Sequence, residues 1–177
     1  MTRLLVLPTL ALLPGCGSLF TIHVEGSSQT TVEAATPLEV LVTDLGFGEF
    51  VSMDITSADE LTNQGVEPGD VQDVRLDVFS LEALEGSADL TFLESFALFV
   101  EAPDLPRVRL TSQDGFPEGE AFVSLMTEDV DLTEYVQSQS LTLSTEVTGQ
   151  RPEVETLVEA RYDLAVGVTA QGVGNNL

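Results

Sequence analysis

The stretch VEARYDLAVGV (residues 158–168) decides the fold class, because apolar and other side chains alternate along it. The apolar set is Val158, Ala160, Tyr162, Leu164, Val166 and Val168. A period of two residues places these side chains on one face of an extended chain, whereas a helix would need a period of 3.6. The stretch therefore predicts a long β-strand with one buried face.

The same alternation recurs elsewhere in the chain. In residues 74–83 the phase changes after Val78, which predicts a bulge near Phe79 or Ser80 because a shift of one residue exchanges the two faces of a strand. The continuously apolar FALFV (residues 96–100) predicts a central strand buried on both faces. Further strands are predicted at residues 21–25, 30–34, 38–42, 50–55, 108–111, 121–126 and 141–147.

Glycine-containing turn signals separate these segments, at Gly86, Gly115, Gly119 and Gly149. Two short helices are also predicted, one over residues 58–64 capped by Ser57 and ended by Gly65, and a turn that starts at Asp131 and runs through Tyr135 and Val136. Roughly eight to ten short strands in one domain predict an all-β fold, a β-sandwich of two antiparallel sheets with immunoglobulin-like or jelly-roll-like connections.

The charge is strongly one-sided. Thirty acidic residues face six basic ones, all of them arginine, and the net charge is −24. Nucleic-acid binding is not expected, because affinity for a phosphate backbone comes from lysine and arginine contacts that release counterions. With 43% hydrophobic residues the chain has enough apolar side chains to fold, and we expect its carboxylates to keep edge strands from pairing.

The N-terminal sequence predicts where the protein is located in the cell. Arg3 precedes a short apolar run (residues 4–13) that is typical of a signal peptide and too short to span a bilayer. Leu13, Pro14, Gly15 and Cys16 then resemble the lipobox of bacterial lipoproteins, although Pro14 stands where that family more often has a small or hydroxylated residue.

The resemblance implies that Cys16 becomes the first residue of the mature protein and carries a diacylglycerol. By the same resemblance Gly17, which is not the aspartate of inner-membrane retention, favours an outer-membrane location. Two or three acyl chains would hold the protein at the membrane permanently. We thus expect a signal peptide (1–15), a lipidated tether (16–20), one sandwich domain (21–170) and a frayed tail (171–177).

The chain is poor in catalytic side chains. It has one histidine, His23, one cysteine, Cys16, and no lysine, so a Ser-His-Asp arrangement could use only His23. We expect His23 to be a partly exposed residue on an edge strand and the protein not to be an enzyme. A small hydrolase that uses two carboxylates remains an alternative, because glycoside hydrolysis needs only two acids.

Calcium is the one cofactor that the residues suggest, since it binds carboxylates on loops. The candidate ligands are Glu128, Asp129, Asp131 and Glu134. Asp129 and Asp131 would project to the same side of an extended segment. The competing interpretation is a solvated loop in which Asp131 caps the short helix. A second acidic loop, which contains Asp114, Glu118 and Glu120, is open to the same two interpretations.

The sequence therefore predicts a non-enzymatic, membrane-anchored lipoprotein of the cell envelope whose β-sandwich has a structural or protein-binding role. Its partners would be the membrane, through the N-terminal lipid, and an envelope protein that the sequence does not name. A calcium-dependent surface adhesion or binding module is the alternative, and lipidation leaves open whether the domain faces the periplasm or the cell surface.

Overall fold

The computed structural model describes residues 20–36, 45, 47, 63, 65–138 and 141–169. Strands dominate these residues, which confirms the predicted all-β class, and one short α-helix accompanies them. The elements are β1 (Phe20–Val32), the 3-10 helix η3 (Pro68–Asp70), β2 (Val71–Glu85), β3 (Leu93–Ala102), β4 (Leu105–Asp114), β5 (Phe122–Thr127), α2 (Thr133–Gln137), β6 (Thr142–Gly149) and β7 (Thr156–Val168).

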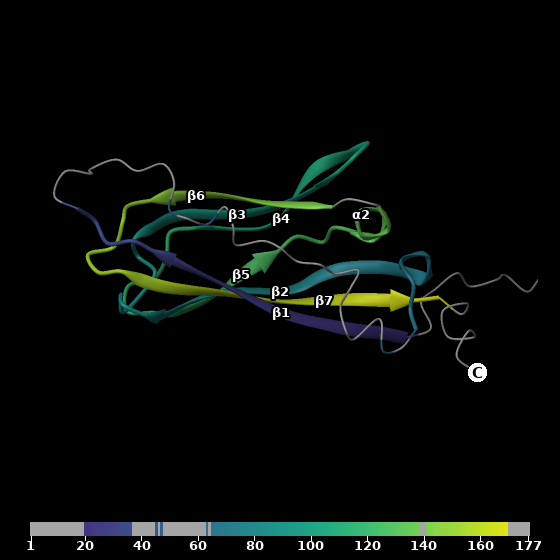
Figure 1. Cartoon of the computed structure of the whole chain (residues 1–177), viewed down its shortest axis with the longest axis horizontal. Coiled ribbons are helices and arrows are strands. Elements are labelled where there is room, and N and C mark those ends of the chain that lie inside the picture. Colours follow the sequence, from purple (N-terminus) through teal and green to yellow (C-terminus); the bar gives the residue numbers. More distant parts are fainter. Residues whose placement is uncertain are drawn as a thin grey trace, which may run out of the picture.

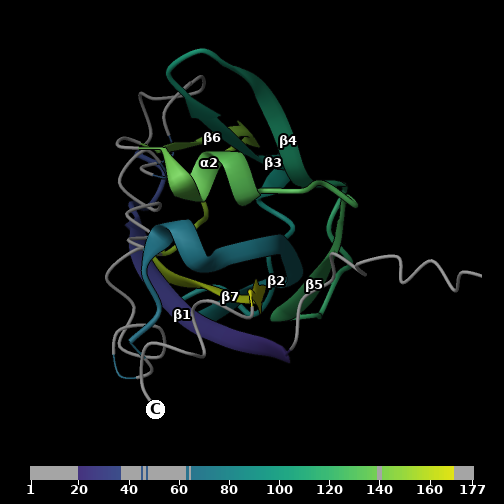
Figure 2. The same ribbon diagram turned by 90° about the vertical axis from the view of Figure 1, so that its right-hand side faces the viewer.

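The strands form one antiparallel sheet in the order β1-β7-β2-β5-β4-β3-β6, strongly curled into a half-barrel (Figures 1 and 2). The predicted two-sheet sandwich is therefore wrong. The cause is β5, which pairs with β2 through residues such as Ser124 and with β4 through Met126 and Thr127. The strand thus joins β1-β7-β2 to β4-β3-β6, which in a sandwich would be separate sheets.

The decisive stretch is confirmed as β7, which pairs with β1 along its whole length and with β2 on its other side. The predicted strands at residues 21–25 and 30–34 are two parts of β1, and those at 108–111, 121–126 and 141–147 are parts of β4, β5 and β6. The predicted strands 38–42 and 50–55 lie outside the described residues, as do Cys16 and the tail. The predicted helix 58–64 does too, except for Asn63, which is in a turn.

The phase change in β2 is confirmed, but the irregularity lies earlier than predicted. The pairing with β7 shifts between Leu76 and Val78, so Val78 points to the outer face while Phe79 points into the core.

In β3 only one face is buried: Phe96, Leu98 and Val100 are inside, whereas Phe99 is half-buried. The prediction of a strand buried on both faces was therefore wrong. The outer face of β3 is covered by a polar side chain, Arg107, whose guanidinium lies 3.7 Å from the Phe99 ring centroid. A continuous apolar run in the sequence does not reveal such a cover.

The core fills the concave side of the half-barrel. At its centre the rings of Phe79 and Phe96 stack with their centroids 5.6 Å apart, and Phe47 meets Phe96 edge-on at 6.1 Å. The hydroxyl of Thr145 on β6 donates to the carbonyl of Phe47 at 3.1 Å. Residue 47 therefore lies against the inner surface of β3 and β6, and closes part of the concave side.

Helix α2 lies at the end of the half-barrel where β2 begins (Figure 2). The Tyr135 hydroxyl donates to the carbonyl of Pro106 at 2.7 Å, and the Gln137 side chain donates to the carbonyl of Val71 at 3.0 Å. Burial raises the pKa of Tyr135, and the Glu134 carboxylate adds to the rise. The helical turn through Tyr135 and Val136 is where the sequence predicted it, and it ties β2 to β4.

Candidate functional site

The loop predicted to bind calcium connects β5 to α2 and is held to β2. The Leu132 amide donates to the carbonyl of Val74 at 2.8 Å, and the Glu128 amide donates to the carbonyl of Leu110 at 2.7 Å. The loop is therefore fixed by its backbone, independently of any bound ion.

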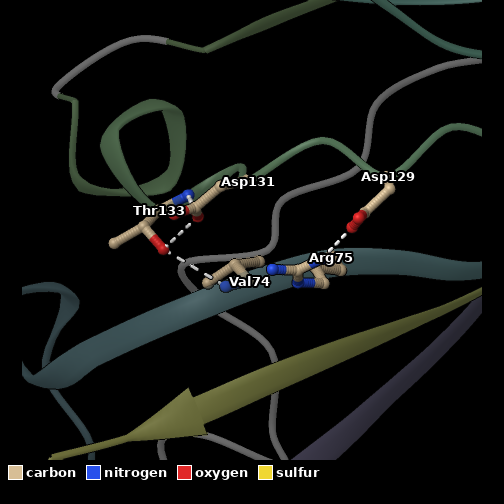
Figure 3. Close-up of polar contacts among 5 residues, drawn as sticks. All are labelled: Val74, Arg75, Asp129, Asp131 and Thr133. Carbon is tan, nitrogen blue, oxygen red and sulfur yellow. Dashed lines mark hydrogen bonds and ion pairs between the residues drawn. The ribbon is translucent and has the colours of Figure 1, made fainter. Parts of the chain in front are cut away.

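The two central carboxylates of this loop have separate protein partners (Figure 3). Asp129 forms an ion pair with Arg75 of β2. Asp131 accepts hydrogen bonds from the hydroxyl of Thr133 at 2.6 Å and from its amide at 2.9 Å, and the same hydroxyl accepts one from the Val74 amide. The hydroxyl bond is the main reason why the pKa of Asp131 lies below its usual range. Asp131 thus lies just before α2 and is bonded to its first residue, but Leu132 occupies the N-cap position, so the predicted cap is one residue off.

The outer two candidates are apart from this pair. Glu128 accepts from Arg109 Nε at 2.5 Å, and Glu134 is exposed on α2. Among the described residues no three His, Cys, Asp or Glu side chains form a group that could hold a metal ion. A calcium ion at Asp129 and Glu128 would compete with the guanidinium groups of Arg75 and Arg109 for these carboxylates, so calcium binding stays a prediction that no contact here supports.

His23 lies on β1, at one edge of the sheet, and is a half-exposed residue there, as predicted. Its Nδ1 lies 3.0 Å from Oδ1 and 3.1 Å from Oδ2 of Asp163 on β7. The hydrogen bond to Asp163, followed by the charge of that carboxylate, raises the pKa of His23, and the charges of Asp77 and Glu25 add to the rise.

We expect the imidazole of His23 to titrate above its ordinary pKa of about 6.5, and nearer to that value in Asp163→Asn. NMR of the chain's sole histidine across pH measures both. Because the folded-state pKa is the higher one, the pair stabilises the fold fully below the unfolded-state pKa and loses its effect as pH rises through the folded-state pKa. A wild-type His23 that titrates at or below about 6.5 would contradict the contact.

The outer, convex face of β1, β7, β2 and β5 holds a depression of about 580 Å³. The register places its side chains in three rows across the strands. The first row is Glu25, Asp163 and Val78, the second is Ser27, Arg161, Ser80 and Ser124, and the third is Gln29, Glu159, Glu82 and Phe122. Of these, Gln29, Glu159, Glu82 and Ser124 lie beside the depression and the others line it.

Arg161 stands in the middle of this face and is held by carboxylates. It donates to Glu82 at 2.7 Å and forms a second ion pair with the buried Glu159. Glu159 has no further hydrogen bond on Oε2 and accepts one from Gln29 on its other oxygen, at 3.0 Å. Arg161 therefore offsets two opposed carboxylates, Glu82 and Glu159, that would otherwise repel each other across the strands.

The remaining arginines are engaged in the same way. Arg107 pairs with Glu146 at 2.7 Å and Arg151 with Glu33 at 3.1 Å, in addition to the pairs of Arg75 and Arg109. Each of the five arginines within the described part of the chain thus has a carboxylate partner. Because acidic residues outnumber basic ones by 30 to six, the surface that remains is dominated by carboxylates.

Three large apolar side chains are exposed on the same outer face. Val78 of β2 is 46% exposed, and Phe122 and Met126 of β5 are 47% and 83% exposed. Sequence reasoning missed this group, because alternation assigned Val78 to the core and gave no reason to prefer one face of β5. The one usable signal was the phase change in β2, because it places Val78 on the outer face of the sheet.

A second depression, of about 500 Å³, lies between the β2–β3 and β6–β7 connections, at the other end of the half-barrel from α2. Phe92, Arg151 and Val154 are among its lining residues. Because Arg151 is already paired with Glu33, the carboxylates of Glu94 and Glu153 leave the lining of this depression negatively charged.

No family model, curated protein or solved structure matches the chain. No helix in the described ranges has the length and apolar character needed to cross a bilayer.

Proposed function

We propose that this chain is a lipid-anchored, non-enzymatic protein of the bacterial outer membrane whose curled sheet binds another envelope protein. The anchoring part is supported by the resemblance of residues 13–16 to a lipobox, with Cys16 as the acylated residue. The tether is short, because the four residues between Cys16 and Thr21 extend over at most ~14 Å.

The observation that carries the binding part is the outer face of β1, β7, β2 and β5. Single exposed apolar residues are normal on soluble proteins, but here Val78, Phe122 and Met126 share one face of two paired strands, beside a depression. Exposed apolar side chains rimmed by charged ones are typical of protein–protein contacts. The face therefore suits a partner protein better than a small-molecule substrate, for which a largely enclosed pocket would be expected.

A non-enzymatic role is supported by the scarcity of catalytic groups. The only imidazole is engaged by Asp163 through Nδ1, and the chain contains no lysine. Nucleophilic and general acid–base catalysis both depend on groups of these kinds, with a base placed beside the nucleophile.

The anchor is tested by feeding cells a palmitate analogue and following the label and the membrane fraction. Wild-type chain is expected to carry label and to sediment with membranes, whereas Cys16→Ser is expected to lose nearly all label and to leave the membrane fraction, because no single residue elsewhere replaces two or three acyl chains. Ser18→Ala, two residues further along the tether, is the matched control and should behave as wild type. A Cys16→Ser chain that is labelled and sediments like wild type would overturn the anchor.

A further inference from the structure

The first row of the outer face contains a pair of like charges whose one basic partner in the described part of the chain is His23. Glu25 of β1 lies directly opposite Asp163 of β7, and such cross-strand neighbours have Cβ atoms about 4.5–5.5 Å apart. Asp163 has His23 as a partner, but within the described residues Glu25 has no ion pair or hydrogen bond from its side chain. The corresponding pair in the third row, Glu82 and Glu159, is offset by the permanently charged Arg161, whereas the first row depends on His23, which is charged only when protonated.

The floor of the depression provides a second, independent indication of a ligand. Ser80 is only 4% exposed, it lines the depression, and no group in the described part of the chain is hydrogen-bonded to its hydroxyl. That hydroxyl is not among the buried side-chain atoms that lack a partner, so it is reached through the depression, where a ligand can replace water as its hydrogen-bond partner. A polar group that entered the depression would supply that partner.

The wall of the depression is apolar. Val78 and Phe122 both line it, and Met126 lies beside Val78 because Phe79 pairs with Leu125 in the adjoining positions. A ligand that fits this site therefore combines a positive charge, a hydrogen-bond donor and an adjacent apolar group.

We propose that the depression binds a basic segment of the partner protein, with an arginine or lysine side chain between Glu25 and Asp163 and an apolar neighbour against Val78 and Phe122. The charged head group donates to the two carboxylates and to the Ser80 hydroxyl. Arg161 does not repel it, because Glu82 and Glu159 neutralise Arg161. The net charge of −24 attracts the same kind of partner over a longer range. This inference rests on the protein-binding part of the proposed function and names the chemistry of the partner.

The test measures binding of a short fluorescein-labelled peptide of arginine, leucine and serine to the full chain in detergent, by fluorescence anisotropy at low salt. A matched peptide has glutamate in place of arginine. Wild-type protein is expected to bind the basic peptide and not the acidic one. In Glu25→Lys the affinity for the basic peptide is expected to fall at least about tenfold, because a like charge then faces the bound cation.

The same substitution gives an opposite result on stability, which separates binding from folding. Glu25→Lys places an ammonium group opposite Asp163 and turns a repulsive cross-strand pair into an attractive one, so its melting temperature should equal or exceed that of wild type. Glu94→Lys is the control, since Glu94 is an exposed carboxylate on β3, three strands beyond β2 in the sheet, and the change in net charge is identical. Glu94→Lys should lower the affinity for the basic peptide less than about twofold at moderate salt, because charges that lie far apart are screened.

Three results would overturn the inference: unchanged binding by Glu25→Lys, an equal loss in Glu94→Lys, or equal binding of the acidic peptide. The peptide assay needs no membrane, so a chain that carries no lipid at Cys16 overturns the anchor and leaves this result standing. A lipidated chain that captures its partner through another face, with Glu25→Lys unaffected, overturns this inference alone.

Discussion

Phe96→Ala is expected to lower the free energy of unfolding by about 3–5 kcal/mol, the usual range for removing a large aromatic side chain from a packed core. Phe96 is almost fully buried on the inner face of β3, stacked on Phe79 and in edge contact with Phe47. These rings come from three separate parts of the chain, so the cavity cannot be refilled by a local movement of one strand. In a chain of this length the melting temperature should fall by about 6–20 °C.

Phe99→Ala is the matched control, because Phe99 is on the same strand and faces outward beneath Arg107. Removing it leaves no internal cavity, and we expect a loss of about 1 kcal/mol. Denaturant unfolding followed by circular dichroism measures both variants. Similar losses for Phe96→Ala and Phe99→Ala would show that the core does not lie on the concave side of the sheet.

Gly86→Ala is expected to cost at least about 3 kcal/mol, because two effects add at this position. Gly86 follows β2 with a φ of 99°, a conformation that other residues rarely adopt. A Cβ atom there would also overlap the carbonyl oxygen of Glu155 in the β6–β7 connection. The turn after β2 can therefore pass this connection only with a glycine.

Gly115→Ala separates the two effects. Gly115 also has a positive φ, of 71°, but nothing lies within 4 Å of the place where its Cβ would be. Its replacement should cost only the conformational strain, about 1–2 kcal/mol. Thermal unfolding of the two variants side by side provides the comparison, and equal destabilisation would refute the close approach at Gly86.

Local structure was largely predictable from the sequence. The strand at residues 158–168, the phase change in β2, the turns at Gly86 and Gly115 and the helical turn after Asp131 all follow from short-range patterns, because side-chain alternation and backbone preference act over a few residues. The position of the bulge was less predictable, since the apolar residue Val78 fits either face by composition and only the pairing with β7 places it outside.

The arrangement of the strands was not predictable in the same way. A sandwich and a curled half-barrel both bury one face of each strand, so both produce the same alternation. The difference depends on β5, whose few residues pair with β2 on one side and β4 on the other. No local pattern in residues 121–126 indicates that the strand has neighbours on both sides.

The partners of the candidate calcium ligands were not predictable from the sequence for a related reason. Carboxylates close together in sequence, such as Asp129 and Asp131, suggested a common ligand, but their side chains have different partners, Arg75 and Thr133, contributed by other positions of the fold. Glu25 and Asp163 lie directly opposite each other although 137 residues separate them in the chain. Because only strand register brings them together, a search along the sequence could not have grouped them.

If Cys16 is acylated as proposed, the start of β1 limits how far from the membrane a partner can be recognised. Glu25 is five residues beyond Phe20, about 17 Å along the strand, and the segment from Cys16 to Phe20 adds at most about 14 Å. If Cys16 is acylated, Glu25 can lie no more than about 30 Å from the bilayer surface. The basic segment of the partner must then be juxtamembrane, where anionic lipid headgroups attract the same residues. The protein would therefore compete with the lipid surface for its partner, and the occupancy of the complex would depend on lipid composition as well as on the concentrations of the two proteins.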